Sequence, residues 1–131
     1  MTDPPERKIL HVIGNLNRWA IQLRAEYLAQ TLPKQYVSVV SGYRQLPDDP
    51  SGYDVVHFHT PCNLHDILAR RPAYLAHPAW GFEVISKRRD DYLERARPYL
   101  YRAAFCVAKN PRLAEWVRPY LIAGLEAVYI P

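Results

Sequence analysis

The stretch at residues 53–61, which reads YDVVHFHTP, constrains the fold more than any other part of the chain. Apolar, β-branched and aromatic residues follow an Asp and end at His59. A short run of this kind is typical of a parallel strand that helices cover on both faces. Side chains alternate along a strand, so Val55, His57 and His59 are predicted to share one face of the sheet.

The other segments can be interpreted as partners of this strand. Apolar runs bounded by Gly, Pro or polar residues predict further strands at 8–14, 36–41, 73–77, 104–108 and 127–130. Helical spacing of apolar residues predicts helices at 19–32, 64–70 and 86–104 and one that begins after Asn110, the expected N-cap, with a kink or break near Pro98. Alternating strands and helices predict an α/β fold, a Rossmann-like open parallel sheet with helices on both faces.

Composition narrows the class of protein but not its function. The chain has 131 residues, about half of them hydrophobic, which predicts one domain over 1–131. It contains no apolar run long enough for a membrane-spanning helix and no apolar signal segment near its first residue. Cys62 and Cys106 are too few for a disulfide framework. We therefore expect a cytoplasmic protein with reduced thiols.

A cluster of basic and aromatic residues between 87 and 102 leaves two interpretations open. It contains Lys87, Arg88, Arg89, Tyr92, Arg95, Arg97, Tyr99, Tyr101 and Arg102. Interleaved acidic residues can pair with these arginines at helical spacing, which indicates a solvated helix face. The alternative is a surface that rests peripherally on anionic lipid at the inner membrane face. The net charge of +4 is mild, and we expect no nucleic-acid partner.

Several short segments, in their order, resemble the N-terminal domain of GT-B glycosyltransferases, in particular the large retaining family numbered four. They are KILHVIG at 8–14, DVVHFH at 54–59, YLAH at 74–77, Phe82-Glu83 and VYIP at 128–131. The resemblance spans nearly the whole chain. It implies two Rossmann-like domains that face each other across a cleft, of which this chain is the acceptor-binding one.

The resemblance implies partners as well as a fold. A C-terminal domain would bind a nucleotide-sugar donor, which is a co-substrate, and no further cofactor is expected. The sugar would pass to a hydroxyl of a glycan, lipid or small-molecule acceptor. The chain departs from the family after the first strand, where GNLNRW at 14–19 keeps only Gly14 of a glycine pair. Two alternatives are open: Asn17 or Arg18 replaces the backbone contacts to the donor phosphates, or the site binds a different ligand.

The resemblance assigns a catalytic role to His77 at the end of the predicted fourth strand, where it would face the transferred sugar. The alternative is a histidine bonded to a nearby carbonyl. Substrate-binding residues would be Gly14, Asn15, His59, Trp80 and Glu83. For His59, capping of the following helix or orientation of the loop is the favoured alternative. For Trp80 and Glu83, a packed loop in which Glu83 caps a helix is equally open.

His57 is interpreted as a core histidine. No carboxylate or further histidine lies near His57 and His59 at ligand spacing in the sequence, so no metal site is expected. A second hypothesis for the whole chain is a non-catalytic binding or interaction module on the same sheet. A nucleotide-cofactor domain is disfavoured because no Gly-x-Gly-x-x-Gly follows the first strand.

Overall fold

Six parallel strands form one sheet in the computed structural model of the chain, in the order β2-β1-β3-β4-β5-β6. The structure describes residues 5–13, 25–27, 29–84 and 91–129. The strands are β1 (Arg7–Ile13), β2 (Tyr36–Gly42), β3 (Val55–Phe58), β4 (Trp80–Val84), β5 (Phe105–Ala108) and β6 (Val128–Tyr129). The predicted α/β open parallel sheet is confirmed.

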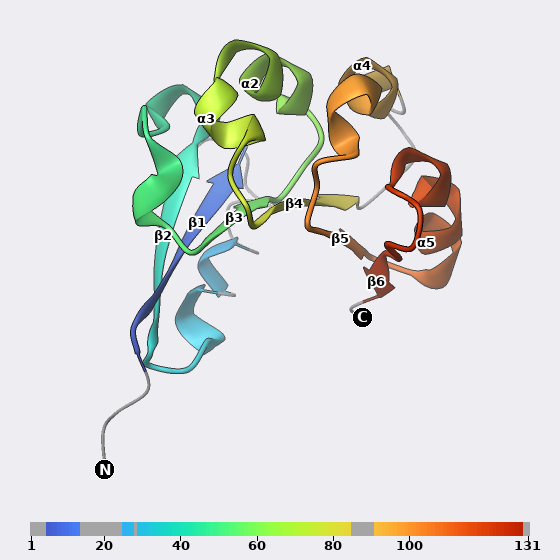
Figure 1. Cartoon of the computed structure of the whole chain (residues 1–131). Coiled ribbons are helices and arrows are strands. Elements are labelled where there is room, and N and C mark those ends of the chain that lie inside the picture. The colour runs from blue at the N-terminus through green and yellow to red at the C-terminus, as the bar shows by residue number, and fades with distance from the viewer. Residues whose placement is uncertain (1–4, 14–24, 28, 85–90, 130–131) are drawn as a thin grey trace.

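Helices connect the strands and lie mainly on one side of the sheet. They are α2 (Leu64–Arg70), α3 (Pro72–Leu75), α4 (Asp91–Leu100) and α5 (Pro111–Val117), with short 3-10 turns at Tyr43–Gln45, Pro50–Gly52 and Arg118–Tyr120. Residues 25–27 and 29–31 are helical and lie on the other side of the sheet from α2 and α3 (Figure 1). No helix within the described ranges is long and apolar enough to cross a membrane.

The face of the sheet toward α2–α5, here called the helix-covered face, carries the hydrophobic core. Its strand residues are Leu10, Val12, Val56, Phe58, Trp80, Phe82, Val84, Cys106 and Ala108. The helices contribute apolar side chains at helical spacing, such as Leu64, Ile67 and Leu68 from α2. These positions alternate with residues that point to the opposite face, as pleated strands require.

Local signals explain where the later helices begin and end. The Asn110 side chain accepts a hydrogen bond from the Leu113 amide at 2.9 Å, and Pro111 is the first helical residue of α5, both as predicted. Pro98 lies inside α4, which ends two residues later at Leu100. Proline cannot donate the backbone bond that would continue the helix, so it belongs near a helix end.

The strand predicted at 73–77 is wrong. Residues Pro72–Leu75 form α3, with proline at the first helical position, and the strand is β4 at Trp80–Val84. A short apolar run such as AYLA cannot be assigned to a strand or a helix from periodicity alone. The true strand includes Gly81 and Glu83, two residue types that are rare in strands, and every one of its residues is buried.

Candidate functional site

The opposite face of the sheet, here called the histidine face, carries His11, His57, His59, Gly81, Glu83 and Phe105. Strand register brings these residues together: His11 pairs with His57, His57 with Gly81, and Gly81 with Phe105. Paired residues of parallel neighbours project from the same side of the sheet. His59 follows β3, and its amide still donates to the Val12 carbonyl at 2.9 Å. Its ring is therefore held beside the other two.

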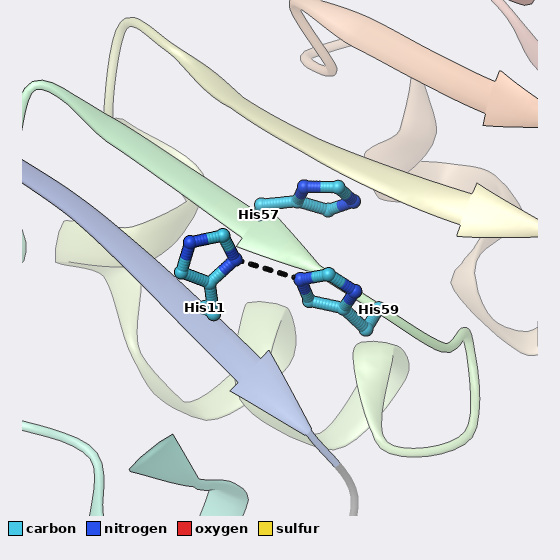
Figure 2. A group of neighbouring side chains, drawn as sticks. All are labelled: His11, His57 and His59. Atoms are coloured by element: carbon cyan, nitrogen blue, oxygen red, sulfur yellow. Dashed lines mark hydrogen bonds between the residues drawn. The ribbon is translucent and has the colours of Figure 1, made fainter. Parts of the chain in front are cut away.

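A chain of polar contacts runs across four strands of the histidine face, from β2 through β1 and β3 to β4. The Nδ1 atom of His11 lies 2.8 Å from Nε2 of His59 (Figure 2), and the other nitrogen of His11 lies 3.1 Å from Ser38 Oγ on β2. Because neutral imidazole has one donor and one acceptor nitrogen, His11 and His59 must share one proton at their contact. The tautomer of each ring therefore depends on its neighbour.

Glu83 closes the chain of contacts from β4. Its Oε1 atom accepts a hydrogen bond from Nε2 of His57 at 3.1 Å and lies 3.8 Å from Nδ1 of His59. Glu83 is fully buried, and a buried carboxyl group is stable only with hydrogen-bonding or charged partners. The rings of His57 and His59 supply them from one strand.

Aromatic packing fixes the orientation of the rings. His57 and His59 are stacked, with ring centroids 3.9 Å apart and an interplanar angle of 13°. The edge of Phe105 meets His57 at 89°. Gly81 makes room for Phe105, because a Cβ atom at that position would lie 2.4 Å from the phenyl ring. The glycine and the phenylalanine thus form one wall of the histidine cluster.

Burial sets the charge of His11. Burial first, and the charge of His57 second, lower the pKa of His11 from 6.5 to about 4, so the ring is neutral near pH 7. Burial first, and the Glu83 carboxylate second, raise the pKa of the nearby Cys106 thiol to about 12. Cys106 therefore remains a thiol, and the imidazoles and the carboxyl group carry the chemistry of this region.

A second feature is a hollow of about 280 Å³ at the carboxyl edge of the sheet, between the β3–α2 loop and α4. Its lining comprises Pro61, Cys62, Asn63, His65, Asp66, Tyr92 and Arg95. Open α/β sheets bind ligands outside the carboxyl ends of their strands. The hollow combines an amide, an imidazole, a carboxylate, a guanidinium and an aromatic ring, which is a polar set that can hydrogen-bond a small hydroxylated ligand.

His77 does not lie at this carboxyl edge, and its predicted position at a strand end is wrong. It precedes β4, so it lies at the amino edge, opposite to His59. Its Nε2 atom donates to the Tyr53 carbonyl at 2.8 Å, and its Nδ1 atom accepts from the Ala79 amide at 3.0 Å. These bonds join the two segments that lead into β3 and β4. The structure thus corresponds to the alternative of a carbonyl-bonded histidine.

The remaining predicted site residues are distributed over different regions. Trp80 is fully buried on the helix-covered face, where it packs against Phe58 and donates to the Leu75 carbonyl at 3.0 Å. The predicted loop around it is strand β4, so Trp80 lies in the core and does not border the hollow. His59 and Glu83 do come together, within the histidine cluster. Gly14 and Asn15 lie outside the described residues.

Sequence reasoning missed His11 as a neighbour of His57, and with it the cluster of three imidazoles. The sequence contained part of the information, because His11 lies inside a predicted strand and residues of adjacent parallel strands lie side by side. Strand order and register were needed to place His11 opposite His57. The contact between Glu83 and His57 could not be found while residue 83 was assigned to a loop.

The arginines of α4 are paired with acidic groups, as the solvated-face interpretation expects. Arg95 lies 3.8 Å from Asp91, and Arg97 bonds to Glu94 at 3.3 Å. Arg97 also lies over the Tyr120 ring, 4.5 Å from its centroid. Arg102 lies over the Tyr101 ring, 5.8 Å from its centroid. Lys87, Arg88 and Arg89 lie outside the described ranges. Contact with anionic lipid stays a prediction.

Comparison with known proteins identified no relative of this chain. No protein-family model, no curated protein and no solved structure matches the chain.

Proposed function

We propose that the chain is the acceptor-side domain of a GT-B type glycosyltransferase and binds a hydroxylated acceptor in the hollow at the carboxyl edge of its sheet. The observation that carries the proposal is the position of this hollow, beside the loop that leaves β3 and the first turns of α4. Open parallel sheets receive ligands at this edge, and the resemblance in sequence extends over the same strands.

The side chains of the hollow suit a sugar-like acceptor. Asn63 precedes α2 but forms no side-chain cap hydrogen bond with it, so its amide is available to a ligand. Asp66 can accept hydrogen bonds from hydroxyl groups, and Arg95 can donate them. Tyr92 supplies an aromatic ring, which can stack on the apolar face of a sugar.

His77 takes no part in this acceptor site, because it lies at the other edge of the sheet. Contacts to the transferred sugar and to the donor diphosphate would come from a second domain and from the loop after β1. A chain with only the acceptor side lacks most of the interactions that stabilise the transition state. We expect the isolated chain to bind an acceptor and to catalyse no transfer.

A non-catalytic binding module is the second candidate. Two observations favour it: a single glycine stands where the family has a pair, and His77 is engaged in backbone contacts away from the hollow. A binding module would use the same hollow but would need no donor domain. The two candidates therefore differ in one result: a donor-binding domain would give sugar transfer with a glycosyltransferase acceptor domain and no transfer with a binding module.

Ligand titration followed by amide NMR tests the proposal. Maltose and UDP-glucose serve as probes of a neutral acceptor and of a nucleotide-sugar donor. We expect saturable shifts with maltose at residues 61–66 and 92–95, and weaker binding in Arg95→Gln and Asn63→Ala. Arg112→Gln, a charge-matched change on the exposed part of α5, should bind as the parent does.

Two outcomes would contradict the proposal. Saturable UDP-glucose binding without any response to a panel of mono- and disaccharides would place the donor on this domain. Maltose shifts that are equal in the parent and in Arg95→Gln would place the ligand outside the hollow. Sugar binding that remains without transfer, after a donor domain is supplied in trans, would favour the binding module.

A further inference from the structure

We propose that His11, His57 and His59 bind one divalent transition-metal ion on the histidine face of the sheet. One ligand nitrogen from each ring lies within 4.8 Å of the others, on two adjacent strands of the central sheet (Figure 2). This inference goes beyond the proposed acceptor site, because the two regions share no residue.

The spacing is close to that of a metal centre. Nitrogen atoms bind zinc at about 2.0–2.1 Å, so two ligands on a tetrahedral ion lie about 3.3 Å apart. His11 and His59 are slightly closer, at 2.8 Å, because a shared proton draws their nitrogens together. The three ligand nitrogens lie up to 4.8 Å apart, whereas ligands of a tetrahedral zinc ion lie about 3.3 Å apart. The ring of His57 must therefore approach the other two by about 1.5 Å. A rotation of the His57 ring that gives up its stacking on His59 would supply this movement.

The outer partners of two rings are those of a metal-binding histidine. A ligating imidazole donates its second N–H group to a carboxylate, carbonyl or hydroxyl group, which fixes its tautomer and its direction. Nε2 of His11 lies 3.1 Å from Ser38 Oγ, and Nδ1 of His59 faces the Glu83 carboxyl group at 3.8 Å. With those outer nitrogens protonated, the lone pairs of both nitrogens at the His11–His59 contact can coordinate a cation that takes the place of the shared proton.

Binding would replace a proton by the ion. In the absence of metal, one proton sits between His11 and His59. When the ion binds, both nitrogens coordinate it through their lone pairs. The proton that they shared moves to an outer ring nitrogen that is unprotonated, or leaves to solvent if both outer nitrogens already carry a proton. No oxidation or reduction takes place. His57 is the most exposed of the three rings, with 14% of its side chain accessible, and gives the ion a route into the cluster.

The ligand set selects the class of metal. Imidazole nitrogen suits zinc, copper, nickel and iron, whereas magnesium and calcium require sets of oxygen ligands. Among the described residues, Glu83 places a carboxyl group beside the rings, and it already bonds to His57. The site should therefore bind Zn²⁺ and Co²⁺ and should not bind Mg²⁺.

Titration of the full chain with Co²⁺ and Zn²⁺ tests the inference. The intense visible absorption of tetrahedral Co²⁺ should appear, saturate at one ion per chain and disappear when Zn²⁺ is added. His11→Gln and His59→Gln should lose this absorption, whereas His65→Ala, which removes an exposed histidine outside the cluster, should retain it. Glu83→Gln keeps all three ligands and should weaken Zn²⁺ binding by about 10–100-fold.

Absence of the tetrahedral Co²⁺ spectrum in the parent chain would overturn the inference, and this measurement requires no variant to fold. Binding that survives in His59→Gln but is lost in His65→Ala would place the ion elsewhere and would also overturn it. If His11→Gln and His59→Gln fail to fold, equal Zn²⁺ affinities of the parent chain and of Glu83→Gln would overturn the inference. Sugar binding in the hollow should be unchanged in His11→Gln, His59→Gln and Glu83→Gln, none of which alters a residue that lines it.

Discussion

The two faces of the same sheet have different roles, although alternate residues of the same strands build both. On the helix-covered face, Val56 and Phe58 pack into a continuous apolar core. On the histidine face, His57 and His59 of the same segment meet Glu83 and His11. The first face gains stability from the apolar area that it buries, whereas the second keeps polar groups that are stable only as partners of one another.

The largest effect should come from the helix-covered face. Phe82→Ala removes a fully buried ring from β4 and leaves a cavity, which should lower the free energy of unfolding by about 3–5 kcal/mol. Urea denaturation measures this change. Tyr101→Ala, at a position that is 53% exposed, is the control and should change it by less than about 0.5 kcal/mol. Similar losses in both variants would contradict the assignment of the core.

The histidine face should make stability depend on pH. The unfolded chain protonates His11 near pH 6.5, whereas the folded protein does so only near pH 4, so the unfolded state binds more protons between these values. The free energy of unfolding should therefore fall by about 3 kcal/mol as the pH decreases through this window, and the loss should level off below pH 4.

His11→Gln provides the comparison for that pH profile. The rings of His57 and His59 face His11, and Glu83 bonds to His57; all three groups are kept in the variant. Denaturation at a series of pH values between about 7 and about 4 gives the slope of the free energy of unfolding against pH. In His11→Gln this slope should be smaller than in the parent by the equivalent of nearly one proton. An unchanged slope would show that His11 does not titrate as its burial requires.

The wall of the histidine cluster that Gly81 and Phe105 form gives a smaller effect. Gly81→Ala places a methyl group against the Phe105 ring and should lower the free energy of unfolding by about 1–3 kcal/mol. Gly52→Ala, where nothing lies within 4 Å of the added carbon, is the matched control. In Phe105→Leu, the alanine at position 81 should cost less. Equal stability of the two alanine variants would show that the ring moves freely.

The smallest effect concerns a helix that lies away from the histidine face. Asn110→Ala removes the hydrogen bond to the Leu113 amide and should cost about 1 kcal/mol. Asn63→Ala is the matched comparison, because Asn63 precedes α2 without a side-chain cap bond and should cost little. Thermal denaturation of both variants distinguishes them. A larger loss in Asn63→Ala would assign a structural role to the hollow.

Sequence reasoning predicted the helix-covered face better than the histidine face. Apolar runs located five of the six strands, because burial on both faces leaves a plain hydrophobic signal. The same rule failed at β4, where Gly81 and Glu83 interrupt the pattern. Gly81 accommodates Phe105 and Glu83 bonds to His57, and both reasons involve residues more than twenty positions away in the chain.

The candidate sites were predicted only in part for the same reason. His59 was assigned to the carboxyl end of its strand, where it lies, since that inference needed only the strand itself. His77 was assigned to the carboxyl edge of the sheet because a strand was predicted at 73–77, where the structure has helix α3. Placing His11 beside His59 required the order of β1 and β3, which the pattern of a single sequence does not contain.

Anomalous diffraction from a crystal soaked with ZnCl2 shows whether the histidine face holds a metal site. We expect one strong zinc peak between His11, His57 and His59, with Glu83 and Ser38 oriented as outer partners. A crystal with its strongest peak at another histidine, or with no peak at the cluster, would contradict it.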